Sequence, residues 1–531
     1  MPGRKNYFYL YRITIVAALG GFLFGYDTAV VSGAVNAIRN YFIFPLSANI
    51  EQAEKVILGY RITVCASVFI IGLAVSGMLL KLFDKKKALI LISGLFISVV
   101  IFFIWFFGKP AVYSETTASA LTGFAISSAL IGCIIGGSGA GFISMVWGRK
   151  NGLIVSGILF FISGLGAAFP DTLNFSGTEP LVSFMLYRII GGIGIGLASM
   201  LSPMYIAEVA PAELRGRLVS WNQMAIVLGM LVVYFVNWSI SRFGDDQWNI
   251  ETGWRYMFLS GVFPSAIFLF LLFFVPETPR YLVMRNKDDG ALRVLRKTVG
   301  EKNAQTILKD IRNTMVEHSA PWLSFGGLII IIAVLLSAFQ QLTGINVVLY
   351  YAPQIFQNTG LQLDVSLMQT ILVGIVNIVF TIVAITTVDR FGRKPLLLTG
   401  GIIMAVAMFS IGLSFYSGRM GLLTLVFILI FIAGFAMSWG PVMWVMLSEI
   451  FPNSIRGAMS IATAMVWITD LIVSWSFPVM DENKTLISLF NHGFSYWLYG
   501  LICIAAVAFV WKMVPETRGK SLEQIEKFWD K

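Results

Sequence analysis

Amide side chains interrupt a long apolar stretch in the second half of the chain. Residues 337–351 read SAFQQLTGINVVLYY, which places Gln340, Gln341 and Asn346 among apolar neighbours. Amides in hydrocarbon require polar partners. Because five residues turn a regular helix by roughly 500°, the glutamines share a face with Asn346 only if Gly344 breaks the helix. Such a break, with amides around one cavity, is typical of a transporter site; a kinked helix bonded to its neighbours is the structural alternative.

Two carboxylates lie inside apolar stretches, where they could carry protons. Asp27 follows the sequence GGFLFGY in the first of these stretches. A carboxylate at that depth must be neutralised by a proton or a nearby cation, unless it lies at a helix end that reaches water. Asp470 lies in a later apolar stretch and is either a second titrating group or a hydrogen-bonded one.

The elements that position these groups are predicted to be membrane-spanning helices. The chain has 531 residues, 57% hydrophobic and 12% charged, with a mean hydropathy of +0.80, which indicates an all-α polytopic membrane protein. Apolar stretches long enough to cross a ~30 Å hydrocarbon core recur, and they lack the strict alternation of barrel strands. We expect about fourteen helices, near residues 10–34, 58–80, 88–107, 120–145, 152–169, 182–206, 219–240, 256–275, 323–350, 367–388, 396–415, 421–447, 459–478 and 494–514.

The net charge of +10 is explained by membrane topology without a nucleic-acid partner. An even number of spans puts both termini on one side. That side carries most of the 38 lysines and arginines, including Lys85–Lys87, Arg149, Lys150 and the 280–312 segment. The positive-inside bias therefore predicts cytoplasmic termini.

Few residues are available for metal, disulfide or catalytic chemistry. Cys65, Cys133 and Cys503 all lie in apolar stretches and are expected to pack there, and two histidines are too few for a zinc site. Nothing pairs a nucleophile with a base, so we expect neither an enzyme nor a metal site. The first apolar stretch is of spanning length and predicts an uncleaved anchor.

Three motifs recur about 240 residues apart, which indicates two homologous halves. ExxPxxxRG occurs at 208–216 and 449–457, GRK at 148–150 and 392–394, and PET at 276–278 and 515–517. We interpret the repeated acid and arginine positions as cytoplasmic latches that hold an inner gate shut. The alternative is ordinary positive-inside charge. The predicted gate residues are Glu208, Arg215, Arg149, Asp389, Arg393, Glu449 and Arg456.

A shorter repeat predicts an inserted helical hairpin. Residues 59–98 match residues 123–162 at an offset of 64, with glycines aligned at three positions, although chance coincidence of glycines competes with duplication. Two extra helices would leave all later spans in the same orientation. The glycine-rich run at 191–196 has no preceding strand, so we interpret it as a helix contact and not as a nucleotide site.

The motifs together resemble those of the sugar porters of the major facilitator superfamily, and most of all its proton-coupled bacterial D-xylose symporters. The resemblance covers the chain except the hairpin near 58–107. It is carried by RIIGG at 188–192, PMYIAE at 203–208, RG at 215–216, PETPR at 276–280, QQ at 340–341, NVVLYY at 346–351, DRFGRK at 389–394, WGP at 439–441, EIFP at 449–452 and PETRGK at 515–520.

The resemblance implies the major facilitator fold, with two six-helix halves related as parallel repeats. The expected organisation is an N-terminal half at 1–276 containing the inserted hairpin at 58–107, a cytoplasmic helical linker at 277–320, a C-terminal half at 321–514 and a cytoplasmic tail at 515–531. It also implies a sugar site at mid-membrane, where neutral amides bond hydroxyls and aromatic faces cover C–H surfaces. The implied site residues are Gln223, Gln340, Gln341, Asn346, Asn377, Trp444, Phe24, Tyr350 and Trp467.

In proton-coupled members the first-helix aspartate titrates and pairs with a fourth-helix arginine, and these positions fall on Asp27 and Arg188. The resemblance therefore implies proton-coupled sugar import across a bacterial cytoplasmic membrane, with D-xylose as the first candidate. The proton is the coupling ion, no other cofactor is expected, and one chain is expected to function as a monomer in the lipid bilayer.

Departures from the family pattern keep alternatives open. Val466 replaces a polar amide beside Trp467, Met230 replaces a second glutamine, and Met145 replaces a polar latch residue. The cargo could thus be glucose, galactose, arabinose or a polyol such as inositol, and the carrier a symporter or a facilitator. A transporter-like sugar sensor is a third possibility, although such sensors are expected to carry a long cytoplasmic tail.

Overall fold

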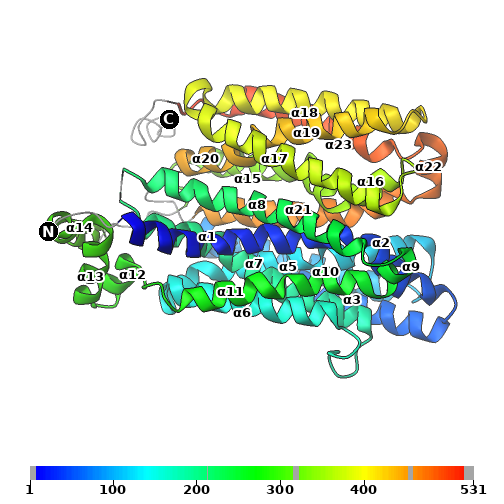
Figure 1. The fold of residues 1–531 in the computed structure, drawn as a ribbon, viewed down its shortest axis with the longest axis horizontal. Coiled ribbons are helices and arrows are strands. Elements are labelled where there is room, and N and C mark those ends of the chain that lie inside the picture. Colours follow the sequence, from blue (N-terminus) through cyan, green and yellow to red (C-terminus); the bar gives the residue numbers. More distant parts are fainter. Residues whose placement is uncertain (1–6, 212, 315–321, 452–457, 519–531) are drawn as a thin grey trace.

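The structure is a computed structural model that describes residues 7–211, 213–314, 322–451 and 458–518. Within these ranges all regular structure is helical and no strand occurs. Fourteen stretches of the described residues are long and apolar enough to span a membrane. They lie side by side along the long axis of the molecule (Figure 1). The predicted all-α polytopic fold and number of spans are confirmed.

Helices of the first part of the chain form one group, and several short helices join them at their ends. Their bounds are α1 Tyr7–Val30, η1 Val31–Gly33, α2 Val35–Ile38, η2 Arg39–Ile43, η3 Phe44–Ser47, α3 Ile50–Leu82, α4 Lys85–Phe107, α5 Glu115–Val146, α6 Arg149–Ala168, α7 Pro180–Val209, α8 Arg215–Ser241, α9 Asp246–Trp248, η4 Asn249–Gly253, α10 Trp254–Ser260 and α11 Val262–Leu272.

Three helices, of which the second and third are rich in charged residues, connect this group to the second one. They are α12 Pro279–Met284, α13 Asp288–Val299 and α14 Glu301–Thr314, and they lie at the left end of the bundle in Figure 1. The helices of the second group are α15 Gly327–Leu342, α16 Ile345–Gln357, α17 Leu363–Phe391, α18 Arg393–Tyr416, α19 Leu422–Ala436, α20 Trp439–Ile450, α21 Met459–Asp481, α22 Lys484–Phe490 and α23 Phe494–Met513.

Glycines let the central helices of the first group approach closely. A Cβ at Gly192 of α7 would lie 1.8 Å from the carbonyl oxygen of Ala129 in α5, and one at Gly196 would lie 2.5 Å from that of Cys133. Any larger residue would push the two backbones apart. The interpretation of the glycine-rich run as a helix contact is confirmed.

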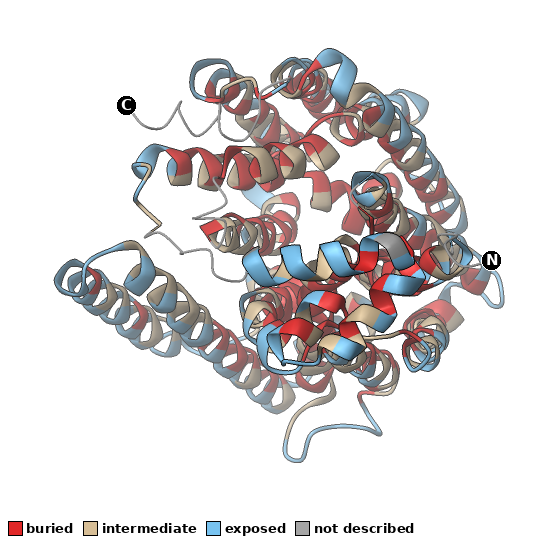
Figure 2. Ribbon diagram, turned by 90° about the vertical axis from the view of Figure 1, so that its left-hand side faces the viewer, coloured by how far each residue is buried: buried red, intermediate tan, exposed pale blue. Residues whose placement is uncertain are grey.

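The two groups of helices meet along α5 with α21 and along α8 with α17. Figure 2 shows buried residues concentrated inside the bundle and exposed residues around its outside. Many of these exposed residues are large and apolar, as expected where lipid is the solvent. Polar side chains in the buried interface between the groups therefore need hydrogen-bond partners from the protein or from a ligand.

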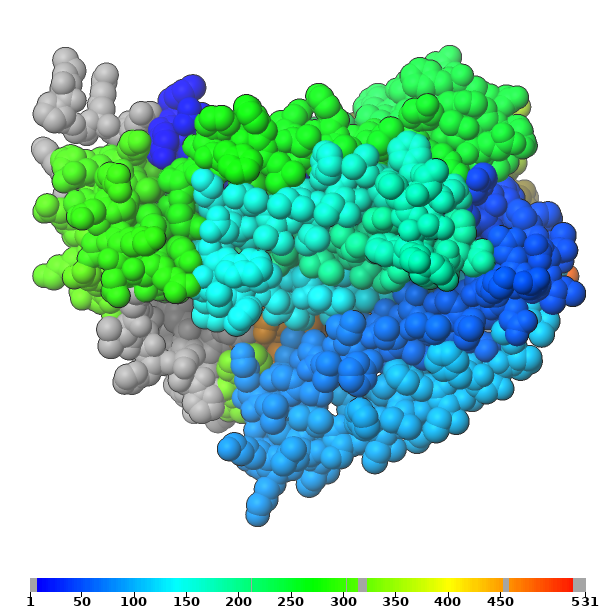
Figure 3. Space-filling view, turned by 90° about the horizontal axis from the view of Figure 1, so that it is seen from below, coloured from blue at the N-terminus to red at the C-terminus, as the bar shows by residue number. Residues whose placement is uncertain are grey.

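The hairpin of α3 and α4 lies along the outside of the bundle (Figure 3). α4 exposes large apolar side chains, among them Ile90 at 71% and Ile104 at 69%. A Cβ at Gly136 of α5 would lie 2.2 Å from a carbonyl oxygen of α7, whereas at the aligned Gly72 the nearest atom is 3.9 Å away. The two matched hairpins thus occupy different environments, and their duplication stays a prediction.

Candidate functional site

The span that carries the paired glutamines is broken at Gly344, as predicted. Helix α15 ends at Leu342 and α16 begins at Ile345, and Gly344 has φ of +85°. That left-handed conformation favours glycine. A Cβ there would also lie 2.7 Å from the ring of Tyr499, so the close packing of α23 excludes a side chain at the break.

The break brings three amides into one chain of hydrogen bonds. Asn346 Nδ2 donates to Gln341 Oε1 at 2.7 Å, and Gln341 Nε2 donates to Gln340 Oε1 at 3.3 Å. Gln340 Nε2 in turn donates to the carbonyl oxygen of Trp439 at 3.0 Å. Both glutamines are buried, and Asn346 is partly exposed. We refer to these three side chains as the amide chain.

The other predicted site residues lie on different helices, outside the described hydrogen bonds of the amide chain. Asn377 is buried in α17, whereas Gln223 in α8 and Trp444 in α20 are half-buried. Phe24 of α1 and Trp467 of α21 come from opposite groups, and their ring centroids lie 5.5 Å apart. Phe24 and Trp467 are therefore in contact across the interface between the groups. Among the described hydrogen bonds, none connects Asn377, Gln223 or Trp444 with the amide chain.

A small cavity lies beside this aromatic pair. It is lined by Gly137 of α5, Met200 of α7, and Thr463 and Trp467 of α21, among others, and holds about 10 Å³, roughly the space of one water molecule. The indole Nε1 of Trp467 is buried and has no hydrogen-bond partner among the described residues. An unsatisfied donor beside a cavity is where a polar ligand would be expected to bind.

Asp27 is paired with a buried arginine. Arg188 is 1% exposed, and its Nη1 lies 3.0 Å from Asp27 Oδ2 while its Nη2 donates to the Asp27 carbonyl oxygen at 3.1 Å. The guanidinium also stacks over Phe258, 5.4 Å from the ring centroid. Its Nε has no partner among the described residues. A cation therefore neutralises Asp27 in this state, and loss of the carboxylate charge would leave a buried arginine unpaired.

The second acid in a span, Asp470 of α21, is fully buried. Ser474 Oγ lies 2.9 Å from one carboxyl oxygen, and the Tyr350 hydroxyl lies 3.3 Å from the other. Tyr350, which was expected to contact sugar, is itself buried and faces this carboxyl. The pair sits next to the amide chain because Asn346 also interacts with Asp470.

The repeated motifs of the first group assemble into one polar cluster at the left end of Figure 1. Arg149 pairs with Glu208 at 2.7 Å, and Thr278 donates to the other oxygen of Glu208 at 2.6 Å. Glu277 accepts from the backbone N–H groups of Arg149 and Lys150 at the start of α6. Burial raises the pKa of Glu277, and the backbone donors oppose that shift. We call this cluster the first latch.

The second group contains the same arrangement, which we call the second latch. Arg393 pairs with Glu449 at 2.7 Å, and Thr517 donates to Glu449 at 2.5 Å. Glu516 accepts from the backbone N–H groups of Arg393 and Lys394 at the start of α18. Glycine precedes both helices, with φ of +95° at Gly148 and +91° at Gly392.

Three further predicted gate residues differ in position. Asp389 is 81% exposed and lies 3.0 Å from Arg393. Arg215 does not join the first latch, because its Nε donates to the carbonyl oxygen of Ala207 at 3.0 Å. Arg456 lies outside the described residues.

Polar contacts at the far end of the bundle, opposite the latches, were not predicted from the sequence. Glu482 accepts from Arg39 and, at 2.5 Å, from Ser119. These contacts join the two groups of helices, as does the contact between Asn36 and Gln357. Burial raises the pKa of Glu482, and Arg39 opposes the shift. The far end is therefore closed by polar contacts between the groups.

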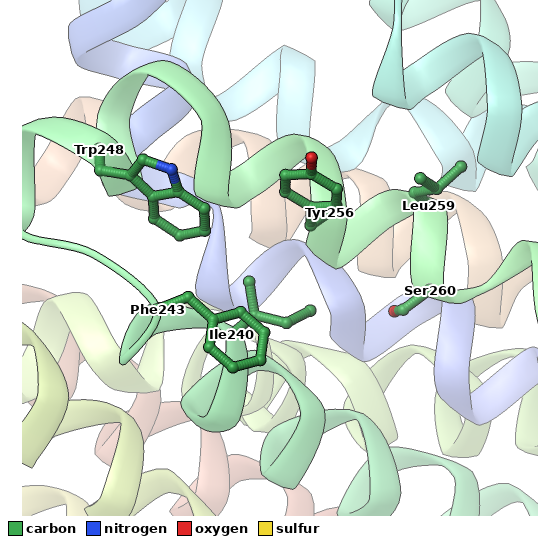
Figure 4. Close-up of a pocket in the computed structure, with 6 residues that line it drawn as sticks. All are labelled: Ile240, Phe243, Trp248, Tyr256, Leu259 and Ser260. Atoms are coloured by element: carbon green, nitrogen blue, oxygen red, sulfur yellow. The ribbon is translucent and has the colours of Figure 1, made fainter.

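A larger cavity lies away from the amide chain. It has a volume of about 480 Å³, and its lining residues come from the ends of α8 and α10 and the segment between them (Figure 4). Phe243, Trp248 and Tyr256 project around it, and only Ser260 among the labelled residues has a short polar side chain. Such an apolar lining offers few hydrogen bonds to a hydroxylated ligand.

The chain is similar in sequence to curated sugar transport proteins. The family model described as "Sugar (and other) transporter" matches residues 13–113 and 93–529. The D-xylose-proton symporter of Escherichia coli (strain K12) is 45% identical over 545 residues, covering 100% of this chain and 98% of that protein. The glucose facilitated diffusion protein of Zymomonas mobilis is 36% identical over 98% of this chain and 97% of that protein.

The similarity extends to solved structures. The xylose transporter XylE of Escherichia coli, in a partially occluded inward-open conformation, superposes with a TM-score of 0.77 at 42% identity, covering 97% of this chain and 99% of that chain. The resemblance predicted from the repeated motifs is confirmed by these matches.

Proposed function

The chain belongs to the sugar transporter family of the major facilitator superfamily, and on that premise we propose that it imports D-xylose together with a proton. The observation that carries the proposal is the ion pair of the partly exposed Asp27 with the buried Arg188, 3.0 Å apart, together with a chain of uncharged amides in the second group of helices. A neutral sugar needs the amides, and a coupling proton needs the carboxylate.

In the proposed site the amide chain and the aromatic pair hold the sugar. Gln340, Gln341 and Asn346 would exchange their mutual hydrogen bonds for bonds to sugar hydroxyls, at little net cost. The Trp467 indole offers both a ring face and a free N–H donor. Gln223, Asn377, Trp444, Phe24 and Tyr350 are proposed to complete the site when the two halves close around the ligand.

Protonation of Asp27 is the proposed coupling step. In this state the carboxylate and Arg188 satisfy each other. A proton on Asp27 removes the negative charge, so Arg188 must find another acceptor or leave its buried position. The equilibrium between the two access states then depends on the proton, and an inward proton gradient drives uptake.

The two latches and the far-end contacts are the proposed gates. The far end is closed across the two groups in this state, and each latch joins residues of a single group. We propose that residues 1–276 and 321–514 move as two halves, linked through 277–320, with the latch end and both termini cytoplasmic. One chain carries the whole pathway, so a monomer in a bacterial cytoplasmic membrane suffices, with the proton as the only coupling ion.

Uptake into proteoliposomes tests the proposal. Radiolabelled D-xylose is supplied with and without an inward proton gradient, and unlabelled sugars compete. Gradient-driven accumulation that is blocked best by D-xylose is expected. Equilibration without accumulation would identify a facilitator and contradict the proposed role of Asp27.

A different monosaccharide or polyol is the second candidate for the cargo. Val466 is buried directly before Trp467, at a position where the family commonly carries an amide, so one hydrogen bond to the ligand is lost. Stronger competition by glucose, galactose, arabinose or inositol would retain the symport mechanism and change the substrate.

A further inference from the structure

Asp470 is a carboxylic acid enclosed in the membrane interior with no cation beside it. Its residue is 0% exposed. Among the described residues, no Lys, Arg or His nitrogen lies within 4.0 Å of its carboxyl. By contrast, Asp27 lies 3.0 Å from Arg188, and Glu208 lies 2.7 Å from Arg149.

The partners of Asp470 are all neutral. They are the hydroxyls of Ser474 and Tyr350 and the amide of Asn346. A buried carboxylate with neutral donors alone is strongly disfavoured, whereas the protonated acid needs only hydrogen bonds, which these groups provide. The Tyr350 hydroxyl donates to Oδ2 at 3.3 Å, and its oxygen can also accept, so a proton on the carboxyl group would have a hydrogen-bond partner there.

The other titratable groups around Asp470 are a thiol and two phenols, and none of them is a cation or a second carboxyl group. Cys133 of α5 lies within electrostatic reach, as do Tyr350 and Tyr351 of α16. Thiols and phenols ionise well above neutral pH. Asp27 and Arg188 also lie within electrostatic reach of Cys133, and they neutralise each other as an ion pair.

Asp470 also lies at one end of the amide chain. The Asn346 amide has two N–H donors, and one of them bonds Gln341 Oε1 at 2.7 Å. The other is available either to the Asp470 carboxyl or to a ligand. An ionised carboxylate holds such a donor more strongly than a neutral acid does.

We propose that Asp470 is a second proton-binding site. When Asp470 is protonated, the second N–H donor of Asn346 is available to the sugar. The inference rests on the proposed sugar site. The proton is taken from water onto one carboxyl oxygen and returned to water on the side on which the sugar binds, so it controls affinity while Asp27 remains the group that carries the coupled proton across. Sugar affinity therefore falls as Asp470 loses its proton, independently of Asp27.

Binding measurements on the purified full chain test this control of affinity. The dissociation constant for D-xylose is measured by calorimetry from about pH 5.5 to 8.5 in the Asp27→Asn background, which removes the first proton site. We expect the constant to rise about tenfold with pH, and to become independent of pH in Asp27→Asn/Asp470→Asn. Asp364→Asn, an exposed acid at the start of α17, is the matched control and should keep the pH dependence.

Infrared spectroscopy without sugar provides an independent measurement. The difference between wild type and Asp470→Asn at neutral pH should contain the C=O band of a protonated carboxyl, and the difference for Asp364→Asn should contain carboxylate bands. Carboxylate bands for Asp470 would overturn the proton site. A carboxyl band combined with pH-independent affinity would overturn its control of Asn346. Failure of wild type to bind D-xylose at any pH would count against the proposed function, and the band alone would then decide on Asp470.

Discussion

The two groups of helices have closely similar contacts in their latches and different polar groups in their interiors. Each latch contains an arginine–glutamate pair at 2.7 Å, a threonine donating to that glutamate, and a glutamate accepting from the start of the helix. Away from the latches the first group holds Asp27 with Arg188, whereas the second holds the amide chain with Asp470. The contacts proposed for gating are therefore alike in the two groups of helices, and the residues proposed to handle ligand and proton differ between them.

The difference also explains how a single chain can couple two solutes. In a charged pair, each unit of pKa change corresponds to about 1.4 kcal/mol of difference in interaction energy between the protonated and ionised states of the acid. Neutral amides bind hydroxyls and carry no titratable charge of their own, so the amide chain depends on pH only through the proposed proton on Asp470. With Asp27 and Arg188 in the first group of helices and the amide chain in the second, the interface between the groups can transmit the coupling step at Asp27 to the sugar site.

The largest expected effect comes from removing the acid of the first half. Asp27→Asn should abolish accumulation of D-xylose, because Arg188 then lacks a partner whose charge depends on pH. Sugar exchange across the membrane should continue, since the amide chain is intact. Accumulation is measured with a proton gradient and exchange without one. Gradient-driven accumulation by Asp27→Asn would contradict the division of roles.

The latches should respond alike to matched substitutions. Glu208→Gln and Glu449→Gln each remove one half-buried ion pair and weaken one threonine contact. We expect each to reduce the rate of uptake on the order of tenfold, as a loss of about 1.4 kcal/mol implies. Glu51→Gln, at an exposed pair with Lys55, is the control. A strong effect in one half and none in the other would show that the two gates are not equivalent.

Truncating an amide should weaken binding without uncoupling transport. Gln340→Ala removes the donor to the Trp439 carbonyl oxygen and one acceptor of the amide chain. We expect D-xylose binding to weaken by about 1–3 kcal/mol. Calorimetry gives the affinity, and accumulation at saturating sugar should persist. Gln362→Ala, an exposed residue before α17, serves as the control, and equal affinities for the two variants would remove Gln340 from the site.

The smallest expected effect concerns pH and stability at the far end. Asp481 accepts from His492 at 3.1 Å, and this hydrogen bond raises the pKa of His492 above its ordinary 6.5. The folded protein therefore binds the proton more tightly than the unfolded chain. This stabilisation is complete below the unfolded pKa and is lost as pH rises through the folded pKa.

Thermal unfolding measures that loss. The fall in Tm from about pH 6 to about pH 8.5 should be larger in wild type than in His492→Gln, because the variant lacks the group that releases its proton. Equal falls would mean that the pair contributes nothing to stability.

The features that could be predicted from the sequence are those set by neighbouring residues or by repeated motifs. Hydropathy and length predict the spans, and Gly344 was identifiable because only a break reconciles the glutamines with Asn346. The ion pairs of Glu208 and Glu449 followed from the repeated motifs. The sequence analysis does not predict that Glu277 and Glu516 accept hydrogen bonds from the starts of α6 and α18. The PET and GRK motifs recur at nearly the same interval, and that shared interval is the signal that pairs them.

Contacts between distant residues could not be predicted. Arg39 and Glu482 are 443 residues apart in sequence, and they meet only because the two halves close at the far end. Nothing local distinguishes either residue from an ordinary charge at a helix end. Arg215 is a different case, because its donor finds the carbonyl oxygen of Ala207, only eight residues away, in place of a glutamate.

The most direct test of the account is whether sugar entry carries protons. Proteoliposomes in a weakly buffered medium, with no imposed gradient, receive D-xylose while a pH dye reports the outside. We predict that D-xylose makes the outside medium more alkaline with wild-type protein and leaves its pH unchanged with Asp27→Asn. Entry of D-xylose with no change in external pH would contradict the claim that Asp27 couples the two solutes.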